Sequence, residues 1–344
     1  MDNAEASTPL PFQLLKLPAV ALNQVVRMMH GSEIMKLSMC SHRLELFMKL
    51  WKYKLKRLEV HLKHESLNFK LTKACIVFRD RELKPHLEPV TKMSQLCGRL
   101  KENVCSTELV LFFSRETMFD LYYLVMSLFA PAAIQWVLNI EELPRETLLR
   151  YLDKGLSENC SEISIENGNL SIERLTELMD RIPVTKGLKV TSWIPSKFKH
   201  PNAFKYRTIW YEVAHWVTLD DLKSIRNADS VVLKWTSFDS KDLNEFLRYW
   251  VDCEEEMMKQ LMFGIHKVID KNILTDQLLV LGAKDGLLPH YHLKKINHKT
   301  GKIVVGRVEI SYGIFMQLRT YDIDHCPRSL AILEEMEKEA ALKK

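Results

Sequence analysis

Residues 11–51, PFQLLKLPAVALNQVVRMMHGSEIMKLSMCSHRLELFMKLW, decide how the amino-terminal part of the chain folds. Pro18 suits a first helical position, because its ring fixes φ and an amide at that position needs no partner. The apolar residues that recur behind it on one helical face are Leu22, Val25, Val26 and Met29. His30-Gly31 ends this helix, since Gly tolerates the left-handed conformation of a helix carboxyl terminus.

Two further short helices follow in the same stretch. Ser32 is predicted to cap the second helix, whose apolar positions are Ile34, Met35 and Leu37. The third is an amphipathic stripe made of Leu44, Phe47, Met48, Trp51, Leu55 and Leu58. Three short helices cannot bury all these groups among themselves, so part of the apolar face needs a partner protein or the following domain. The pattern alone supports either interpretation.

The pattern from Leu17 to Arg43 also has a family likeness. Its elements are Leu17-Pro18, Leu22, Val25-Val26, Ile34-Met35-x-Leu37-Ser38 and Cys40-Ser41-x-Arg43. These residues resemble the F-box motif, most closely the version found in nematode F-box proteins. The resemblance implies docking to a Skp-type adaptor and, through it, to a cullin in an SCF-type ubiquitin ligase. The contact residues it implies are Leu17, Pro18, Leu22, Val25, Val26, Ile34, Met35 and Leu37.

The bulk composition is that of an ordinary globular protein. The chain has 344 residues, 47% of them hydrophobic and 27% charged, enough for two or three domains. The net charge of +5 is small and both signs are interleaved, which argues against nucleic acid as a partner. Residues 1–10 are predicted to form a flexible leader without a signal peptide.

Seven cysteines are scattered without a CxxC pair, which favours reduced thiols in the cytoplasm or nucleus. They are Cys40, Cys75, Cys97, Cys105, Cys160, Cys253 and Cys326.

One apolar run is long enough to be weighed as a membrane span. From Leu121 to Ile140 no charged residue occurs, and the length would suffice. Pro131 interrupts the run, however, and a run broken by proline is typical of two elements. We therefore predict a buried helix to about Phe129, followed by a buried strand, and no membrane contact.

Past Leu58 the hydrophobic period changes from helical to alternating. The predicted strands of this region are 58–62, 67–71, 75–78, 104–113 and 136–140. The predicted helices are 88–100, 116–129 and 144–156.

In the second half, three helix starts share one capping chemistry. Ser171, Thr218 and Asp239 each lie between an apolar residue before the helix and another in its first turn. Strands are predicted at 162–165, 230–235 and 260–265, spaced as in a leucine-rich-repeat-like array, although no repeat consensus is present. Two strands, 292–296 and 303–308, are predicted to form a β-hairpin, with a third strand at 314–318 and a charged helix at 334–344. The predicted fold class is α+β or α/β: a three-helix F-box, then an irregular leucine-rich-repeat-like αβ solenoid ending in a β-hairpin.

A second likeness covers residues 218–319. It is carried by TLDDL at 218–222, SVVLKW at 230–235, SFDSKDLNEFLRYW at 237–250 and QLMFGI at 260–265. This series resembles the type 2 F-box-associated domain of nematode F-box proteins. The resulting domain prediction is a leader at 1–10, an F-box at 11–58, an αβ region at 59–217, the associated domain at 218–320 and a tail at 321–344.

Sequence patterns typical of catalytic or metal-binding sites are weak in this chain. His61-x-x-His64 and His290-x-His292 each offer two ligands, but no Cys or carboxylate follows at a zinc-like spacing. No phosphate-binding glycine loop or nucleophile elbow occurs. The basic cluster 52–57 is interpreted as the solvated polar face of the third helix. We predict no cofactor, no metal and no enzymatic activity.

Five tryptophans crowd into residues 193–250. Trp235 and Trp250 lie on stripes that look buried, so we predict that both fill the core. Trp193 and Trp210 flank a loop rich in proline and lysine and are the better candidates for contact with a protein substrate.

The leading hypothesis is a substrate adaptor of a ubiquitin ligase. The alternative is a structural or scaffolding interaction protein whose amino-terminal helices pack internally and recruit no ligase. A hydrolase or transferase with an unrecognised site stays open, because the absence of a motif is weak evidence.

Overall fold

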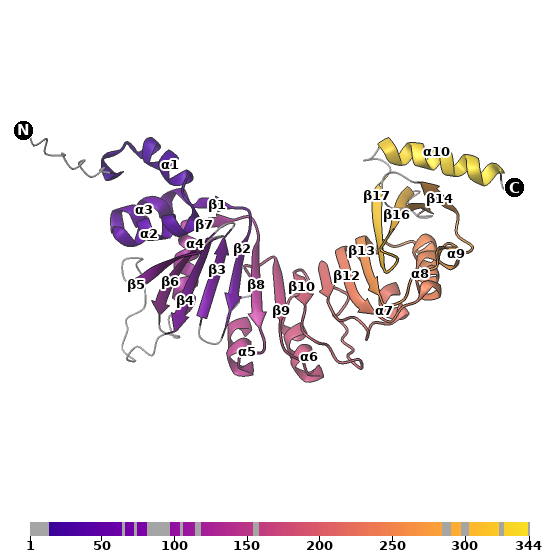
Figure 1. Cartoon of the computed structure of the whole chain (residues 1–344), viewed down its shortest axis with the longest axis horizontal. Helices are drawn as coiled ribbons and strands as arrows, with labels where there is room; N and C mark the ends of the chain where they lie inside the picture. The colour runs from indigo at the N-terminus through magenta and orange to yellow at the C-terminus, as the bar shows by residue number, and fades with distance from the viewer. Residues whose placement is uncertain are drawn as a thin grey trace, which may run out of the picture. The chain divides into compact units, whose positions relative to one another are not determined.

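A computed structural model describes residues 14–63, 66–71, 74–80, 97–103, 106–113, 118–153, 158–283, 290–296, 303–322 and 327–342 (Figure 1). The chain forms two compact units, Met1–Ile134 and Gln135–Lys344, which are described separately. The division lies inside the αβ region predicted at 59–217.

The first unit begins with short helices, as predicted. They are the 3-10 helix η1 (Leu14–Lys16), α1 (Ala19–Arg27), α2 (Gly31–Cys40) and α3 (His42–Trp51). The cap of α2 is His30, not Ser32: the Glu33 carboxylate accepts the His30 backbone N–H at 2.7 Å, so the helix starts one residue before Ser32. Val26, Met35 and Met48, one from each helix, are fully buried and form the core of the helical part.

The third helix is shorter than predicted. It ends at Trp51, and Lys52 has a φ of 40°, a left-handed conformation that stops the helix. Leu55 therefore lies in strand β1 (Tyr53–Leu55) and Leu58 in β2 (Leu58–Leu62), rather than on the helix. The basic cluster 52–57 follows α3 and does not form its polar face.

A mixed sheet completes the first unit. Its strand order is β2, β3 (Ser66–Leu71), β4 (Ala74–Asp80), β6 (Ser106–Phe113) and β5 (Cys97–Asn103). Only β4 and β6 are parallel neighbours in this group. The strands predicted at 58–62, 67–71 and 75–78 are confirmed, and the one predicted at 104–113 is confirmed for 106–113, since 104 and 105 lie outside the described residues. The helix predicted at 88–100 is wrong for 97–100, which are strand, and its remainder lies outside the described residues.

The uncharged run divides into a helix and following strands, as predicted. The helix α4 (Met118–Leu128) begins just before the run and ends ahead of Pro131; it is followed by β7 (Phe129–Pro131), which pairs with β1, and by β8 (Ile134–Asn139). Within the described residues, no helix has the length and apolar character needed to cross a membrane.

The second unit is built on parallel strands that follow one another in chain order. They are β8, β9 (Glu162–Glu166), β10 (Gly187–Val190), β11 (Thr208–Tyr211), β12 (Ala228–Thr236) and β13 (Met258–Ile265). The connecting helices are α5 (Arg145–Asp153), α6 (Ile172–Arg181), α7 (Leu219–Lys223) and α8 (Ser240–Asp252). The coarse α+β class is confirmed, whereas the repeat solenoid stays a prediction. Strands β10 and β11 were not predicted.

The capping prediction for three of these helices is confirmed. Ser171 accepts the backbone N–H of Arg174 at 3.2 Å. Thr218 and Asp221 cap α7 reciprocally, and Asp239 and Asp242 do the same for α8. Each cap follows a parallel strand or its loop, so it fixes where the chain turns back along the sheet.

A loop replaces the helix between β10 and β11. It is stabilised by buried aromatic rings, with Phe198 5.1 Å and Phe204 5.7 Å from the ring centroid of Trp216. The hydroxyl of Tyr206 donates to the carbonyl of Met179 at 3.2 Å, which ties the loop to α6. This loop carries its own apolar core and therefore needs no helix to cover the sheet.

An antiparallel extension closes the second unit. From β13 the order is β17 (Phe315–Asp322), β16 (Ile303–Ser311), β15 (His290–Ile296) and β14 (Val280–Ala283). It also contains α9 (Lys271–Leu274) and α10 (Pro327–Leu342). The strands of the predicted hairpin and the third strand are confirmed, and the carboxyl-terminal helix begins earlier than predicted.

Candidate protein-binding surfaces

The eight predicted adaptor contacts divide into two groups in the first unit. Pro18 is exposed, and Leu17, Val25 and Leu37 are half-buried. The other four, each at most 5% exposed, are Leu22, Val26, Ile34 and Met35. The buried group forms the interior that holds the helices together, so only the first group is available for contact in this conformation.

Other apolar side chains of the helices are far more exposed. Val20, Met28 and Leu50 are 69%, 79% and 80% exposed, and Leu46 is 53% exposed. Sequence reasoning passed over them because they lie off the helical stripes. They lie on α1, directly after it and on α3, and large exposed apolar groups are typical of a protein-contact surface.

In the second unit, exposed aromatic side chains line the ends of the parallel strands. Trp193, just past β10, is 53% exposed, and its ring centroid lies 5.1 Å from that of His215. Trp235, at the end of β12, is 59% exposed and lies 5.4 Å from His266. We call these four residues the carboxyl edge.

The prediction that Trp235 fills the core is wrong. The pairing of β12 with β13 shifts register between Leu233 and Thr236, and Trp235 has a φ of 50°. Such a bulge re-aims the side chain, so the alternation that would have buried Trp235 fails at this residue. Trp250 is 1% exposed, as predicted.

Trp210 lies on a strand face, unlike Trp193. Its ring is flanked by the ammonium groups of Lys189 and Lys234, at 5.4 and 5.0 Å from the centroid. Its indole N–H donates to Glu212 at 2.9 Å, and Glu212 also accepts from Lys234 at 3.0 Å. The two tryptophans predicted as substrate contacts therefore lie in different settings, one at the carboxyl edge and one within a charged cluster on the sheet.

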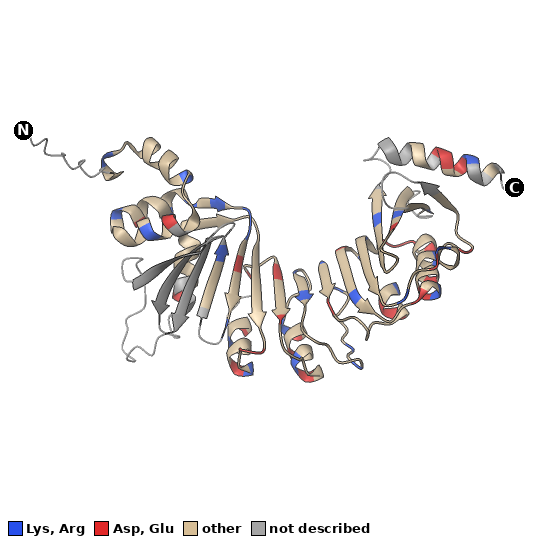
Figure 2. Ribbon diagram, in the orientation of Figure 1, with Lys and Arg blue, Asp and Glu red and all other residues tan. Residues whose placement is uncertain are grey.

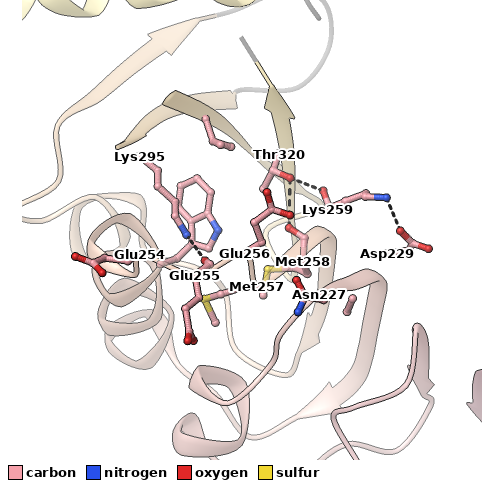
Figure 3. A pocket seen from close by; sticks show the side chains of 13 residues that line it. Asn227, Asp229, Glu254, Glu255, Glu256, Met257, Met258, Lys259, Lys295 and Thr320 are labelled. Atoms are coloured by element: carbon pink, nitrogen blue, oxygen red, sulfur yellow. Dashed lines mark hydrogen bonds and ion pairs between the residues drawn. The ribbon is translucent and has the colours of Figure 1, made fainter. Parts of the chain in front are cut away.

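A cavity of about 390 Å³ opens at the opposite, amino-terminal ends of β12 and β13 (Figure 3). Trp250 of α8 lines it, together with Met257, Met258 and the glutamates 254–256. Gly306 of β16 permits this arrangement, because a Cβ there would lie 2.6 Å from the Trp250 ring.

The two lysines of this cavity have partners: Lys259 pairs with Asp229 at 2.6 Å, and Lys295 contacts a backbone carbonyl and an aromatic ring. Lys295 is 5% exposed, its ammonium lies 5.5 Å from the Trp250 centroid, and it donates to the Glu255 carbonyl at 2.8 Å (Figure 3). Burial lowers the pKa of Lys295, and the positive charge of Arg226 acts in the same direction. The Thr320 hydroxyl donates to the carbonyls of Met258 and Lys259. These contacts join the parallel sheet to its antiparallel extension and give the cavity a structural role.

The histidine pairs weighed as metal ligands lie in different surroundings. His61 contacts Glu59 at 3.2 Å, and His64 lies outside the described residues. His290 and His292 are buried in β15, with ring centroids 5.0 Å apart. In the described part of the chain no three His, Cys, Asp or Glu side chains gather as a metal site.

The charged side chains of α5 and α6 and the buried thiol of Cys160 do not mark a further site. Acidic and basic residues are interspersed over α5 and α6, where Arg145 pairs with Glu177 at 2.8 Å (Figure 2). Cys160 is 4% exposed, and burial raises the pKa of its thiol to about 11. A thiol in that state is a poor nucleophile at neutral pH.

Comparison with known proteins bears on the second unit. Residues 197–263 match the family model described as F-box associated. The match includes β11, β12, α8 and most of β13, and it begins before the boundary predicted at 218. It contains His215 and Trp235 of the carboxyl edge.

A curated relative is the Skn-1 dependent zygotic transcript 15 protein of Caenorhabditis elegans. It is 28% identical over 120 residues, which are 34% of this chain and 35% of the worm protein. The chain thus covers only about a third of that relative's length. No solved structure matches the chain.

Proposed function

We propose that the chain is a substrate-recognition adaptor of an SCF-type cullin–RING ubiquitin ligase and not itself an enzyme. Its amino-terminal helices would dock onto a Skp-type adaptor, and the second unit would capture a protein substrate. The observation that carries the proposal is the F-box-associated match at 197–263, because domains of this description accompany an F-box and the helices at 14–51 resemble one.

The docking surface would consist of exposed groups held by buried ones. Leu17, Pro18, Val25 and Leu37 would bury apolar area against the adaptor, at about 25 cal/mol per Å² before the cost of association. The buried members of the predicted set would keep α1 and α2 in position. Truncating Leu17 and Pro18 should therefore weaken docking without unfolding the unit.

The test is co-expression with a Skp-type adaptor followed by gel filtration. The wild-type chain is expected to form a one-to-one complex, and Leu17→Ala with Pro18→Ala is expected to lose it. Leu279→Ala is the matched control, since it removes a 44% exposed leucine of the second unit, outside the amino-terminal helices. Retention of the complex by the double variant would refute the contact surface, and a wild-type chain that ignores the adaptor would refute the function.

The alternative function, a scaffold that recruits no ligase, is favoured by one observation. Leu22, Val26, Ile34 and Met35 are buried within the first unit, so the helices have an internal packing role. Limited proteolysis separates the two functions: a docking domain without its partner should be cut early within residues 1–60, whereas an internally packed one should resist.

A further inference from the structure

The cavity at the amino-terminal ends of β12 and β13 has the size of a small-molecule site. Its volume of about 390 Å³ lies within the range of about 300–1,000 Å³ that such sites occupy. At about 30 Å³ per water molecule, this volume corresponds to about 13 waters, or to a ligand of about ten to fifteen non-hydrogen atoms. The side chains around the cavity therefore leave room for a ligand between them.

A buried ammonium group lies in the wall of this cavity. Lys295 is 5% exposed, and Figure 3 shows its nitrogen directed at the Glu255 carbonyl, which accepts one hydrogen bond at 2.8 Å. An ammonium has three N–H donors, and within the described residues this carbonyl is the one hydrogen-bond acceptor of Lys295. A buried charge without a counter-ion is unfavourable, so an anion placed beside Lys295 would offset that cost.

Apolar side chains surround the ammonium. The Trp250 ring centroid lies 5.5 Å from it, and Met257 and Met258 also line the cavity (Figure 3). Methionine side chains adapt to irregular shapes, and an aromatic ring offers a flat surface against which a second ring can pack. The cavity therefore suits a ligand that carries an apolar body next to its anionic group.

The other charged residues of the cavity limit the charge that a ligand can carry. The lining contains four acidic residues, Asp229 and the glutamates 254–256, and two lysines, Lys259 and Lys295. Lys259 already pairs with Asp229 at 2.6 Å. The acidic majority would repel a dianion such as a phosphate monoester, whereas a single carboxylate needs only the Lys295 ammonium.

We propose that this cavity binds a small monocarboxylate with an apolar body of about the size of an aromatic ring. The carboxylate would accept hydrogen bonds from the Lys295 ammonium, and the apolar body would lie against Trp250 and Met257. Because Lys295 belongs to β15 and Met257 directly precedes β13, the ligand would add a contact between the parallel sheet and its antiparallel extension. Binding of this kind does not depend on the ligase function.

The test is isothermal titration calorimetry of hydrocinnamate, a phenyl ring joined to a carboxylate by two methylene groups, into the full chain at pH 7. One molecule is expected to bind per chain, with a Kd of about 1 mM or below. Lys295→Met keeps an unbranched side chain without the ammonium and should weaken binding at least tenfold. Lys294→Met is the matched control, because Lys294 pairs with Glu337 at 2.8 Å and lies outside the cavity lining. This variant should bind as wild type.

A ligand series on the wild-type chain decides the question even if Lys295→Met does not fold. Hydrocinnamyl alcohol lacks the charge and hydrocinnamyl phosphate is a dianion, so each should bind at least tenfold more weakly than hydrocinnamate. Equal binding of the alcohol, or unchanged binding in a folded Lys295→Met variant, would overturn the role of Lys295. Tighter binding of the phosphate would overturn the monocarboxylate, and no detectable binding of hydrocinnamate would overturn the site itself.

Discussion

In the second unit, side chains at the two ends of the parallel strands differ: charged groups pair with one another at the amino-terminal ends, and aromatic groups are exposed at the carboxyl-terminal ends. At the amino-terminal ends, Asp229 accepts from Arg207 and, at 2.6 Å, from Lys259, while Arg226 pairs with Glu255. At the carboxyl-terminal ends, Trp193 and Trp235 are more than half exposed.

This difference suggests that the amino-terminal ends stabilise the fold and that the carboxyl-terminal ends are the ones available to a partner protein. The amino-terminal ends join β12 and β13 to the antiparallel strands, and their charges are engaged across strands. The carboxyl-terminal ends carry helix caps and loops, where side chains can face a partner protein without breaking a sheet. Substitutions should therefore affect stability at one end and binding at the other.

The largest expected loss of stability is that of Trp250→Ala, at the amino-terminal ends of the parallel strands. The ring is 1% exposed and lies between the Lys295 ammonium and Gly306, so its removal leaves a cavity and should cost about 3–5 kcal/mol of unfolding free energy. Trp193→Ala removes an exposed ring and should change stability by about 0.5 kcal/mol or less. Urea unfolding followed by circular dichroism measures both, and equal losses would contradict the division between the two ends.

The next effect concerns the cap that begins α8 after β12. The Asp239 carboxylate accepts the backbone N–H groups of Lys241 at 2.8 Å and Asp242 at 3.1 Å. Asp239→Ala leaves these donors unpaired and should cost about 1–2 kcal/mol. Asp239→Asn keeps an acceptor and should lose much less, as judged by thermal unfolding. Similar losses in both variants would show that the carboxylate charge, and not the hydrogen bond, matters.

A smaller effect, a gain in stability, is expected from a substitution at Trp235. Trp235→Gly removes the left-handed strain at φ 50° and should raise the unfolding free energy by about 0.5–1 kcal/mol. Trp193→Gly is the control: Trp193 is not among the residues with positive φ, so the added chain entropy should destabilise it. A destabilised Trp235→Gly variant would mean that this ring supports the fold.

These contrasts show which features the sequence could predict. The caps Ser171, Thr218 and Asp239 were found because capping is a local interaction between residues two or three positions apart. The end of α4 ahead of Pro131 was found for the same reason, since proline and the residue before it do not continue a helix. Local chemistry therefore placed most helices and strands of the described chain.

The features that were missed depend on tertiary context. Trp235 lies on an apparently buried stripe, and only its bulge against β13 exposes it. The third helix was extended to Leu58 because periodicity does not reveal where Lys52 turns left-handed. The cavity beside Trp250 requires the approach of Gly306, which is more than fifty residues away in the chain and has no local signature.

The smallest effect tests the charge cluster at the amino-terminal ends. Hydrogen bonds from Lys259 and then Arg207 lower the pKa of Asp229 below its ordinary value, so its contribution is full above about pH 4, the unfolded pKa, and is lost as pH falls through the folded pKa.

Lys259 and Arg207 are 76% and 70% exposed, and solvent screening therefore limits the contribution of Asp229 to about 1 kcal/mol or less. Asp229→Asn should be less stable than wild type at pH 7 in urea unfolding, and the difference should shrink as the pH falls below about 4. Asp276→Asn, an exposed position away from this cluster, should stay within about 0.5 kcal/mol of wild type at pH 7. A pH-independent deficit in Asp229→Asn would show that Asp229 acts through packing, and the amino-terminal ends would then owe their stability to Trp250 and its neighbours alone.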